Sequence, residues 1–409
     1  MFNIKYLKEI EFIKIFVAIL FLLVVAFNLG LLGNDHFVKL AESFASGHLY
    51  FSEEYVSDLL ARYDTVQIND KFYWPLGPLP AVLLMPFLFL TKFYSVNLQG
   101  LLNIFLVLAT FFIVYRVSKK QGFIENDAIF LAIAFCFASM FMGVALRPSS
   151  WYFAHTVTVL FIFIALLEYF SKKRLWIIGI LFGLIALTRM TATIGIIFFI
   201  LDIFLNAKDS FRIKFDKLVK LLLPFALLVM ILLFYNYARF NNFFEQGYTN
   251  QILIEAHTKA RSYGILSIKH LPGNLYYALL SFPEPVFKDQ ISHVLTFPFI
   301  KSNLWGMSIF ITSPYLLYLF FMKFKDRLSK LLIATVFLVA VPLFLYYGIG
   351  YVQFGYRYAL DFMPFLFLLF MKNYYDIKGK LTIGIKSVFL ISATFNMYLF
   401  LTFLYGANL

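Results

Sequence analysis

Asp35 is the first acidic residue after the opening hydrophobic run, in the stretch Gly33-Asn34-Asp35-His36. Apolar residues recur at helical spacing just after it, so a short amphipathic helix should begin there. A partly desolvated carboxylate at a membrane surface can have a raised pKa and take a proton from a hydroxyl group. Asp35 is therefore a candidate general base. The alternative is that Asn34 or Asp35 only caps this helix, a position that both residue types favour.

Four arginines stand at the ends of hydrophobic runs, apart from the main clusters of basic residues: Arg147, Arg189, Arg239 and Arg357. Ionisable groups near membrane depth are functional candidates. Arginine binds phosphate through two parallel hydrogen bonds, so a phosphate group is the expected partner. The alternative is that some of these side chains only extend to lipid phosphates at the membrane surface.

Six further residues are candidates for substrate contact: Glu42, Tyr73, Trp74, His155, Glu245 and Tyr248. Tyr73 and Trp74 precede a proline-rich stretch and suit either a wall for a sugar or lipid or an aromatic belt at the interface. A solvated surface position is the alternative for Glu42, and helix packing is the alternative for His155. Nothing in the spacing of Glu245 and Tyr248 singles them out, although they follow closely on Arg239.

No metal site or cofactor is predicted. His36 and His48 lack convergent partners at metal-ligand spacing. The chain has one cysteine, Cys136, which excludes an intramolecular disulfide and a cysteine-based zinc site.

The composition predicts an all-α polytopic membrane protein, because 62% of the 409 residues are hydrophobic and only 14% are charged. Many apolar runs reach the ~20 residues that a bilayer-spanning helix needs. The net charge of +13 is attributed to cytoplasmic loops rich in Lys and Arg rather than to nucleic-acid binding.

We predict about eleven transmembrane helices in one domain, 1–409, with the N-terminus in the cytoplasm. Their expected positions are 12–32, 98–115, 128–144, 154–169, 175–187, 191–205, 218–237, 304–321, 331–347, 358–371 and 381–404. The segment 76–90 is expected to be interfacial or re-entrant, because counting it as a span would move the later basic clusters to the outer face. Two long loops, 33–97 and 238–303, then lie on the extracytoplasmic side, and 281–298 should be irregular because it contains three prolines.

The order of several short motifs resembles the GT-C superfamily of integral membrane glycosyltransferases, most closely its bacterial protein-mannosyltransferase and aminoarabinose-transferase branch. The motifs are Gly33-Asn34-Asp35-His36, Tyr73-Trp74-Pro75-Leu76-Gly77-Pro78, Leu187-Thr188-Arg189, Asn236-Tyr237-Ala238-Arg239-Phe240, Glu245-Gln246-Gly247-Tyr248 and Phe354-Gly355-Tyr356-Arg357-Tyr358 followed by Asp361. The resemblance implies a polyprenyl-phosphate sugar donor, inverting transfer on the extracytoplasmic face of the cell membrane, and Asp35 as the base. Many relatives have two adjacent acids where this chain has Asp35 and His36, which weakens any proposal of a bound metal.

The expected mechanism has Asp35 deprotonate the hydroxyl of a glycan, lipid or protein acceptor. Arg239 and Arg357, and then Arg189, would stabilise the departing polyprenyl phosphate. One alternative is a polymerase or ligase of lipid-linked polysaccharides. The other is a lipid or sugar transporter or flippase, which should show internal repeats and ionisable residues in mid-membrane.

Overall fold

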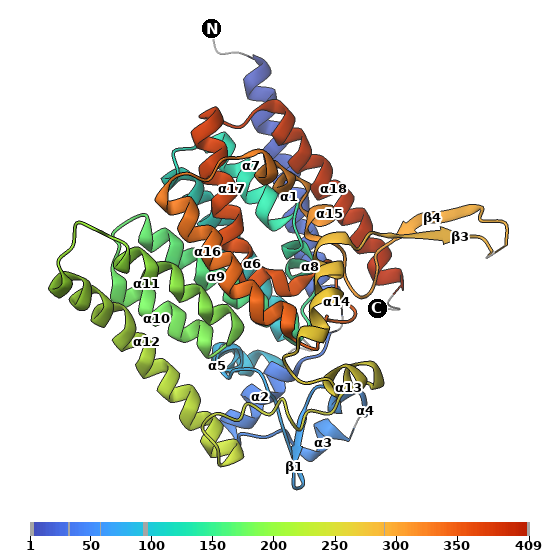
Figure 1. Ribbon diagram of the computed structural model, residues 1–409. Helices are drawn as coiled ribbons and strands as arrows, with labels where there is room; N and C mark the ends of the chain where they lie inside the picture. The colour runs from blue at the N-terminus through green and yellow to red at the C-terminus, as the bar shows by residue number, and fades with distance from the viewer. Residues whose placement is uncertain (1–3, 32, 58, 93–96, 290, 407–409) are drawn as a thin grey trace.

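The computed structural model describes residues 4–31, 33–57, 59–92, 97–289 and 291–406. Six long helices form the frame of the molecule (Figure 1). They are α1 (Ile4–Gly30), α6 (Leu98–Lys120), α9 (Ser150–Tyr169), α12 (Phe211–Phe240), α16 (Arg327–Leu345) and α18 (Ile383–Gly406). Each contains an apolar stretch long enough to cross a membrane. The prediction of a mostly helical chain with apolar helices long enough to span a membrane is therefore confirmed.

The other predicted spans form shorter helices: α7 (Glu125–Cys136), α8 (Phe141–Leu146), α10 (Leu175–Ala186), η2 (Thr191–Ile196), α11 (Ile197–Phe204), α15 (Ile309–Thr312), η5 (Pro314–Phe321), η6 (Arg357–Asp361) and α17 (Met363–Lys378). The run 128–144 is interrupted between α7 and α8, where the Ser139 hydroxyl accepts a hydrogen bond from the Phe141 amide at 3.0 Å. Eleven spans therefore stay a prediction, because only six of the described helices have the length and composition to cross alone.

The segment 76–90 forms two short pieces, α5 (Leu79–Leu84) and η1 (Met85–Lys92), and neither is long enough to cross a bilayer. Gly77 lets this segment approach the end of α10, because a Cβ atom at Gly77 would lie 2.1 Å from the Leu187 carbonyl oxygen. The Leu79 amide donates to that same oxygen at 3.0 Å. The proline-rich stretch is thereby fixed against the bundle.

Short elements from both long loops gather at one end of the bundle, which we call the loop end (Figure 1). They are α2 (His36–Ala45), α3 (Glu53–Val56), α4 (Leu59–Arg62), β1 (Val66–Ile68), β2 (Lys71–Tyr73), α13 (Glu255–Arg261), η3 (Ile268–His270), α14 (Leu271–Leu275) and η4 (Tyr276–Leu280). The amphipathic helix predicted after Asp35 is confirmed as α2, which buries Phe37 and Leu40 and begins directly after Asp35.

The expectation that 281–298 is irregular was wrong for the two parts of that segment that form strands. Strands β3 (Glu284–Phe287) and β4 (Leu295–Lys301) pair antiparallel, with Glu284 opposite Lys301. Proline within a strand is tolerated at a sheet edge, and both strands of this hairpin are edges. Together with β1 and β2, this makes two small β-hairpins in the part of the chain that the structure describes.

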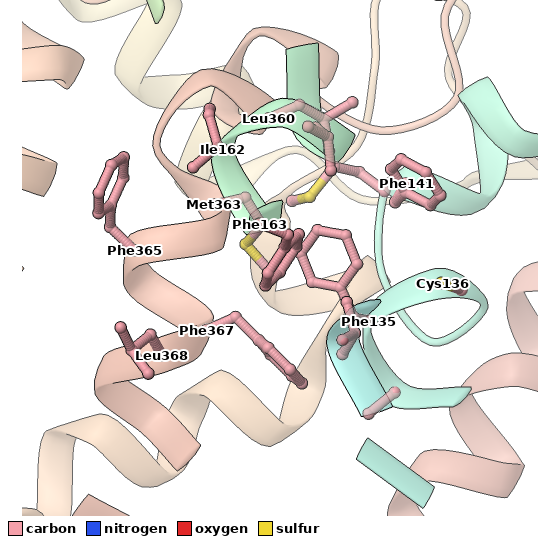
Figure 2. Close-up of a cluster of buried hydrophobic side chains, with 14 of the residues drawn as sticks. Phe135, Cys136, Phe141, Ile162, Phe163, Leu360, Met363, Phe365, Phe367 and Leu368 are labelled. Carbon is pink, nitrogen blue, oxygen red and sulfur yellow. The ribbon is translucent and has the colours of Figure 1, made fainter. Parts of the chain in front are cut away.

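The packed core lies where α7, α8, α9, η6 and α17 meet (Figure 2). The Phe135 ring contacts Phe163 and Phe367 at ring-centroid distances of 4.6 and 5.3 Å. Both η6 and the start of α9 continue from this core toward the loop end, so side chains on them are held by well-packed supports.

Candidate functional site

Two adjoining cavities open at the loop end, with volumes of about 320 and 270 Å³. Four residues line both of them: Asp64, Trp151, His257 and Arg357. These residues come from the first long loop, the start of α9, α13 and η6 respectively. The volumes suit parts of a small-molecule ligand, so we call this pair of cavities the candidate site.

Asp64 reaches the site because the two long loops pair with each other. The Asp64 amide donates to the Ile252 carbonyl at 2.8 Å, and the Ile252 amide donates to the Thr65 carbonyl at 2.8 Å. Val66 and Gln251 form an antiparallel bridge beside these bonds. Asp64 itself has a left-handed backbone with φ of 66°, a conformation that clusters at functional sites.

The side chain of Gln251 links Asp64 to Tyr347 through two hydrogen bonds. Its side-chain amide donates to the Asp64 carbonyl at 3.0 Å, and its oxygen accepts from the Tyr347 hydroxyl at 3.3 Å. Burial raises the pKa of Asp64 to about 6, and the positive charge of Arg357 opposes this rise. A carboxylate with this pKa can both accept and release a proton near neutral pH.

Arg147 and Arg357 both lie close to the Tyr152 ring and form the cationic part of the site. Their guanidinium carbons lie 5.2 and 5.3 Å from the Tyr152 ring centroid. Each donates one hydrogen bond to a carbonyl, of Val352 and Tyr351 respectively. Both side chains are 7% exposed, and within the described part of the chain neither forms a salt bridge with a carboxylate. Two buried positive charges that form no salt bridge are suited to an anionic ligand.

His257 faces the same space and is neutral near pH 7. Burial, and to a smaller extent the positive charge of Arg357, lowers its pKa to about 4. Its Nε2 atom is buried without a hydrogen-bond partner, so it is available to a bound ligand.

Arg189 lines the larger cavity but is already paired. Its Nε and a terminal nitrogen donate to the two oxygens of Asp361 at 2.9 and 3.1 Å. The Thr191 hydroxyl also donates to Asp361, and the His155 Nδ1 atom lies 3.6 Å from the same carboxylate. The charge of Arg189 is thus largely compensated, which makes it a weaker phosphate ligand than Arg147 or Arg357.

Replacing Arg189 by methionine should destabilise the protein strongly, because it leaves the fully buried Asp361 carboxylate without its cation. Breaking one side of a buried ion pair costs about 3–5 kcal/mol. Thermal unfolding in detergent measures the loss, and the double variant Arg189→Met/Asp361→Asn should recover part of it. Equal stability of Arg189→Met and the wild type would show that the pair contributes nothing.

Arg239, near the end of α12, joins this helix to the first long loop and does not line the cavities shared by Asp64 and Arg357. It donates to the Trp74 carbonyl at 2.6 Å and to the Asn236 side chain at 2.8 Å. Its guanidinium lies 3.9 Å from the Tyr235 ring centroid. Arg239 lines only a small hollow, which it shares with Arg189 and Tyr248.

Asp35 occupies the N-cap position of α2, but its side chain makes no capping hydrogen bond. Burial raises its pKa, Lys39 opposes the rise, and Tyr55 hydrogen-bonds to the carboxylate. Asp35 does not line either cavity of the candidate site, whereas its neighbour Asn34 lines the smaller one. Its role as a base stays a prediction.

The remaining predicted contacts are spread over different surroundings. Tyr248 lines the larger cavity. Trp74 is buried and stacks on His36 at 4.0 Å, and the Trp74 ring contacts Trp151, which does line the site. Tyr73 is buried beside Phe240.

Glu42, Glu245 and His155 do not line the candidate site. Glu42 pairs with Lys39 at 3.0 Å. Glu245 accepts hydrogen bonds from the Gly247 amide and the Thr249 hydroxyl within its own loop. His155 is fully buried next to Asp361.

Asp64, His257, Trp151 and Tyr152 were not singled out from the sequence. Asp64 is one of several acids in the first loop, and no spacing distinguishes it from the others. Among the described residues, no three His, Cys, Asp or Glu side chains converge as they would around a metal ion.

No protein-family model and no curated protein matches the sequence. The fold is similar to a crystal structure of an oligosaccharyltransferase from Archaeoglobus fulgidus in its apo form, with a TM-score of 0.47 and 14% sequence identity. The match covers 93% of this chain and 54% of that protein, so the chain spans about half the length of its structural neighbour.

Proposed function

We propose that the protein is a membrane glycosyltransferase that moves a sugar from a polyprenyl-phosphate donor to an acceptor hydroxyl on the extracytoplasmic face. One observation carries the proposal. Two buried arginines that form no salt bridge with any described residue, Arg147 and Arg357, lie in the same site as a carboxylate, Asp64, whose pKa is raised to about 6. Binding a phosphate and removing a proton are the two tasks of this reaction.

In the proposed reaction Asp64 takes the proton of the acceptor hydroxyl as the acceptor oxygen bonds to the anomeric carbon. The bond between that carbon and the phosphate oxygen breaks, and the polyprenyl phosphate leaves with the electron pair. Arg147 and Arg357 stabilise the negative charge that develops on this oxygen, a contribution that is often the largest in catalysis. The neutral His257 and the indole of Trp151 would orient the sugar between them.

Asp35 is the second candidate for the base. Its pKa is also raised by burial, and the resemblance of the sequence to GT-C enzymes favours it. Asp64 is preferred because it lines both cavities and lies within the electrostatic influence of Arg357.

The proposal is tested by following radiolabel from polyprenyl-phosphate sugars in membranes that contain the wild-type protein or the Asp64→Asn variant. Label entering a glycan, lipid or protein acceptor with the wild type only is the expected result. If label moves only from polyprenyl-diphosphate oligosaccharides, the protein is a polymerase or ligase instead. If a labelled lipid crosses vesicle membranes without any transfer, the protein is a transporter or flippase.

The transfer rate should rise with pH and level off above about pH 6, because Asp64 acts as a base only when it is ionised. Below that pKa the rate should fall about tenfold per pH unit. In Arg357→Met the stabilising positive charge is lost, so the pKa of Asp64 should rise and the rising part of the pH–rate profile should move to higher pH. If the rate rises over the same pH range in both proteins, a group other than Asp64 titrates.

A further inference from the structure

The β3–β4 hairpin extends sideways from the bundle, beyond α18 (Figure 1). Its surface is unusually apolar for a projecting hairpin. Large hydrophobic side chains are exposed along it and at its base: Phe282 (64%), Ile291 (91%), Val294 (54%), Leu295 (50%), Phe297 (78%) and Phe299 (52%). An exposed apolar patch of this kind marks a surface that is covered by another molecule or by a membrane.

The hairpin is attached to α18 close to its C-terminal end. The Tyr398 hydroxyl donates to the Pro298 carbonyl. The Ser302 amide donates to the Thr402 hydroxyl at 3.1 Å, and the Ser302 hydroxyl donates to the Leu399 carbonyl at 2.7 Å. These bonds fix the height at which the hairpin leaves the bundle.

The points on α18 to which the hairpin is attached would lie near the edge of a membrane spanned by this helix. Helix α18 has 24 residues and, at about 1.5 Å per residue, is a few ångströms longer than a hydrocarbon core of about 30 Å. The attachment points at 399 and 402 lie about 6–10 Å from the end of the helix at Gly406. The hairpin therefore starts near the boundary between the hydrocarbon and the lipid headgroups.

We propose that the β3–β4 hairpin lies along the surface of the bilayer at the loop end and inserts its exposed Phe and aliphatic side chains among the lipids. The exposed apolar surface of α18, including Phe395 and Leu401, adjoins the base of the hairpin and continues this lipid contact.

A position at the interface suits both the backbone groups and the charged side chains of the hairpin. Its two edge strands leave backbone groups that would be costly in the hydrocarbon core, and at the interface these groups reach water or headgroups. Lys288 is exposed near the tip, where its long side chain would reach lipid phosphates, whereas Lys301 at the base pairs with Glu284 at 3.7 Å. A covering protein, or a second copy of the chain, is the competing arrangement.

Site-directed fluorescence distinguishes these arrangements. The single native cysteine, Cys136, is fully buried, so an environment-sensitive NBD label can be directed to Phe297→Cys or Ile291→Cys. Ser262→Cys, on the exposed turn after α13, is the matched control. Each labelled protein is reconstituted into phosphatidylcholine vesicles, with lipids that carry a nitroxide near the headgroup or with iodide in solution.

Labels at 297 and 291 should emit at shorter wavelength than the label at 262 and be quenched several-fold more by the nitroxide lipid. They should be quenched less than the control by iodide. Iodide quenching equal to that at 262 would place the hairpin in water and overturn the proposal. Short-wavelength emission with quenching by neither agent would show a protein cover, which also overturns it. Size-exclusion profiles that match the wild type confirm folding.

Discussion

Replacing Asp64 by asparagine should lower kcat/KM for sugar transfer by about 10²–10⁴-fold, the range that a general base contributes. Asparagine keeps the size of the side chain and its hydrogen-bonding contact with Gln251, so the fold should be retained. It cannot accept the proton of the acceptor hydroxyl. Initial rates at varied acceptor concentration measure the loss, and binding of the donor should change little.

Two matched variants make this experiment decisive. Asp70→Asn changes an exposed acid in the same loop and should leave the rate unchanged. Asp35→Asn tests the base that the sequence resemblance predicts. Full activity of Asp64→Asn together with a large loss in Asp35→Asn would reverse the assignment made from the cavities.

Replacing Arg357 by methionine should lower kcat/KM for the donor by about 30- to several thousand-fold. Removing one partner from a buried, hydrogen-bonded charge pair costs about 2–5 kcal/mol. Arg357 would be one such partner of the bound phosphate, because it is buried and forms no salt bridge within the described part of the chain. Arg147→Met should act in the same direction, because both guanidinium groups lie close to the Tyr152 ring. Steady-state kinetics with varied donor concentration provide the measurement.

The Arg357→Lys variant distinguishes a general effect of positive charge from specific recognition of the phosphate group. Arg357→Lys should recover only part of the activity, since an ammonium group lacks the planar pair of donors. Arg116→Met removes an exposed arginine at the far end of α6 and serves as the control. Normal donor kinetics in both Arg357→Met and Arg147→Met would exclude the proposed phosphate site.

The long helices and the start of α2 were predictable because hydropathy and helical spacing are local properties of the sequence. The site was only partly predictable. Arg357 and Arg147 were found as isolated arginines, but the same criterion also selected Arg189. Its partner Asp361 lies 172 positions away, and no local pattern indicates that the two charges meet.

Asp64 could not be found by spacing for a related reason. Its position depends on pairing between the two long loops, and its neighbours in the chain are ordinary loop residues. The hairpin formed by β3 and β4 was missed because three prolines normally argue against strands, while a two-stranded hairpin offers edge positions where proline is tolerated.

The pairing between the two long loops also determines when the protein can first become active during its synthesis. Gln251, which holds Asp64 in place, is 187 positions further along the chain, and Arg357 follows later still. In the proposed topology, a nascent chain inserted into the membrane therefore carries this acid in an unfinished loop until the second loop has been translocated. The proposed site is complete only when most of the helices have already been inserted, so an unfinished chain should not consume the donor lipid.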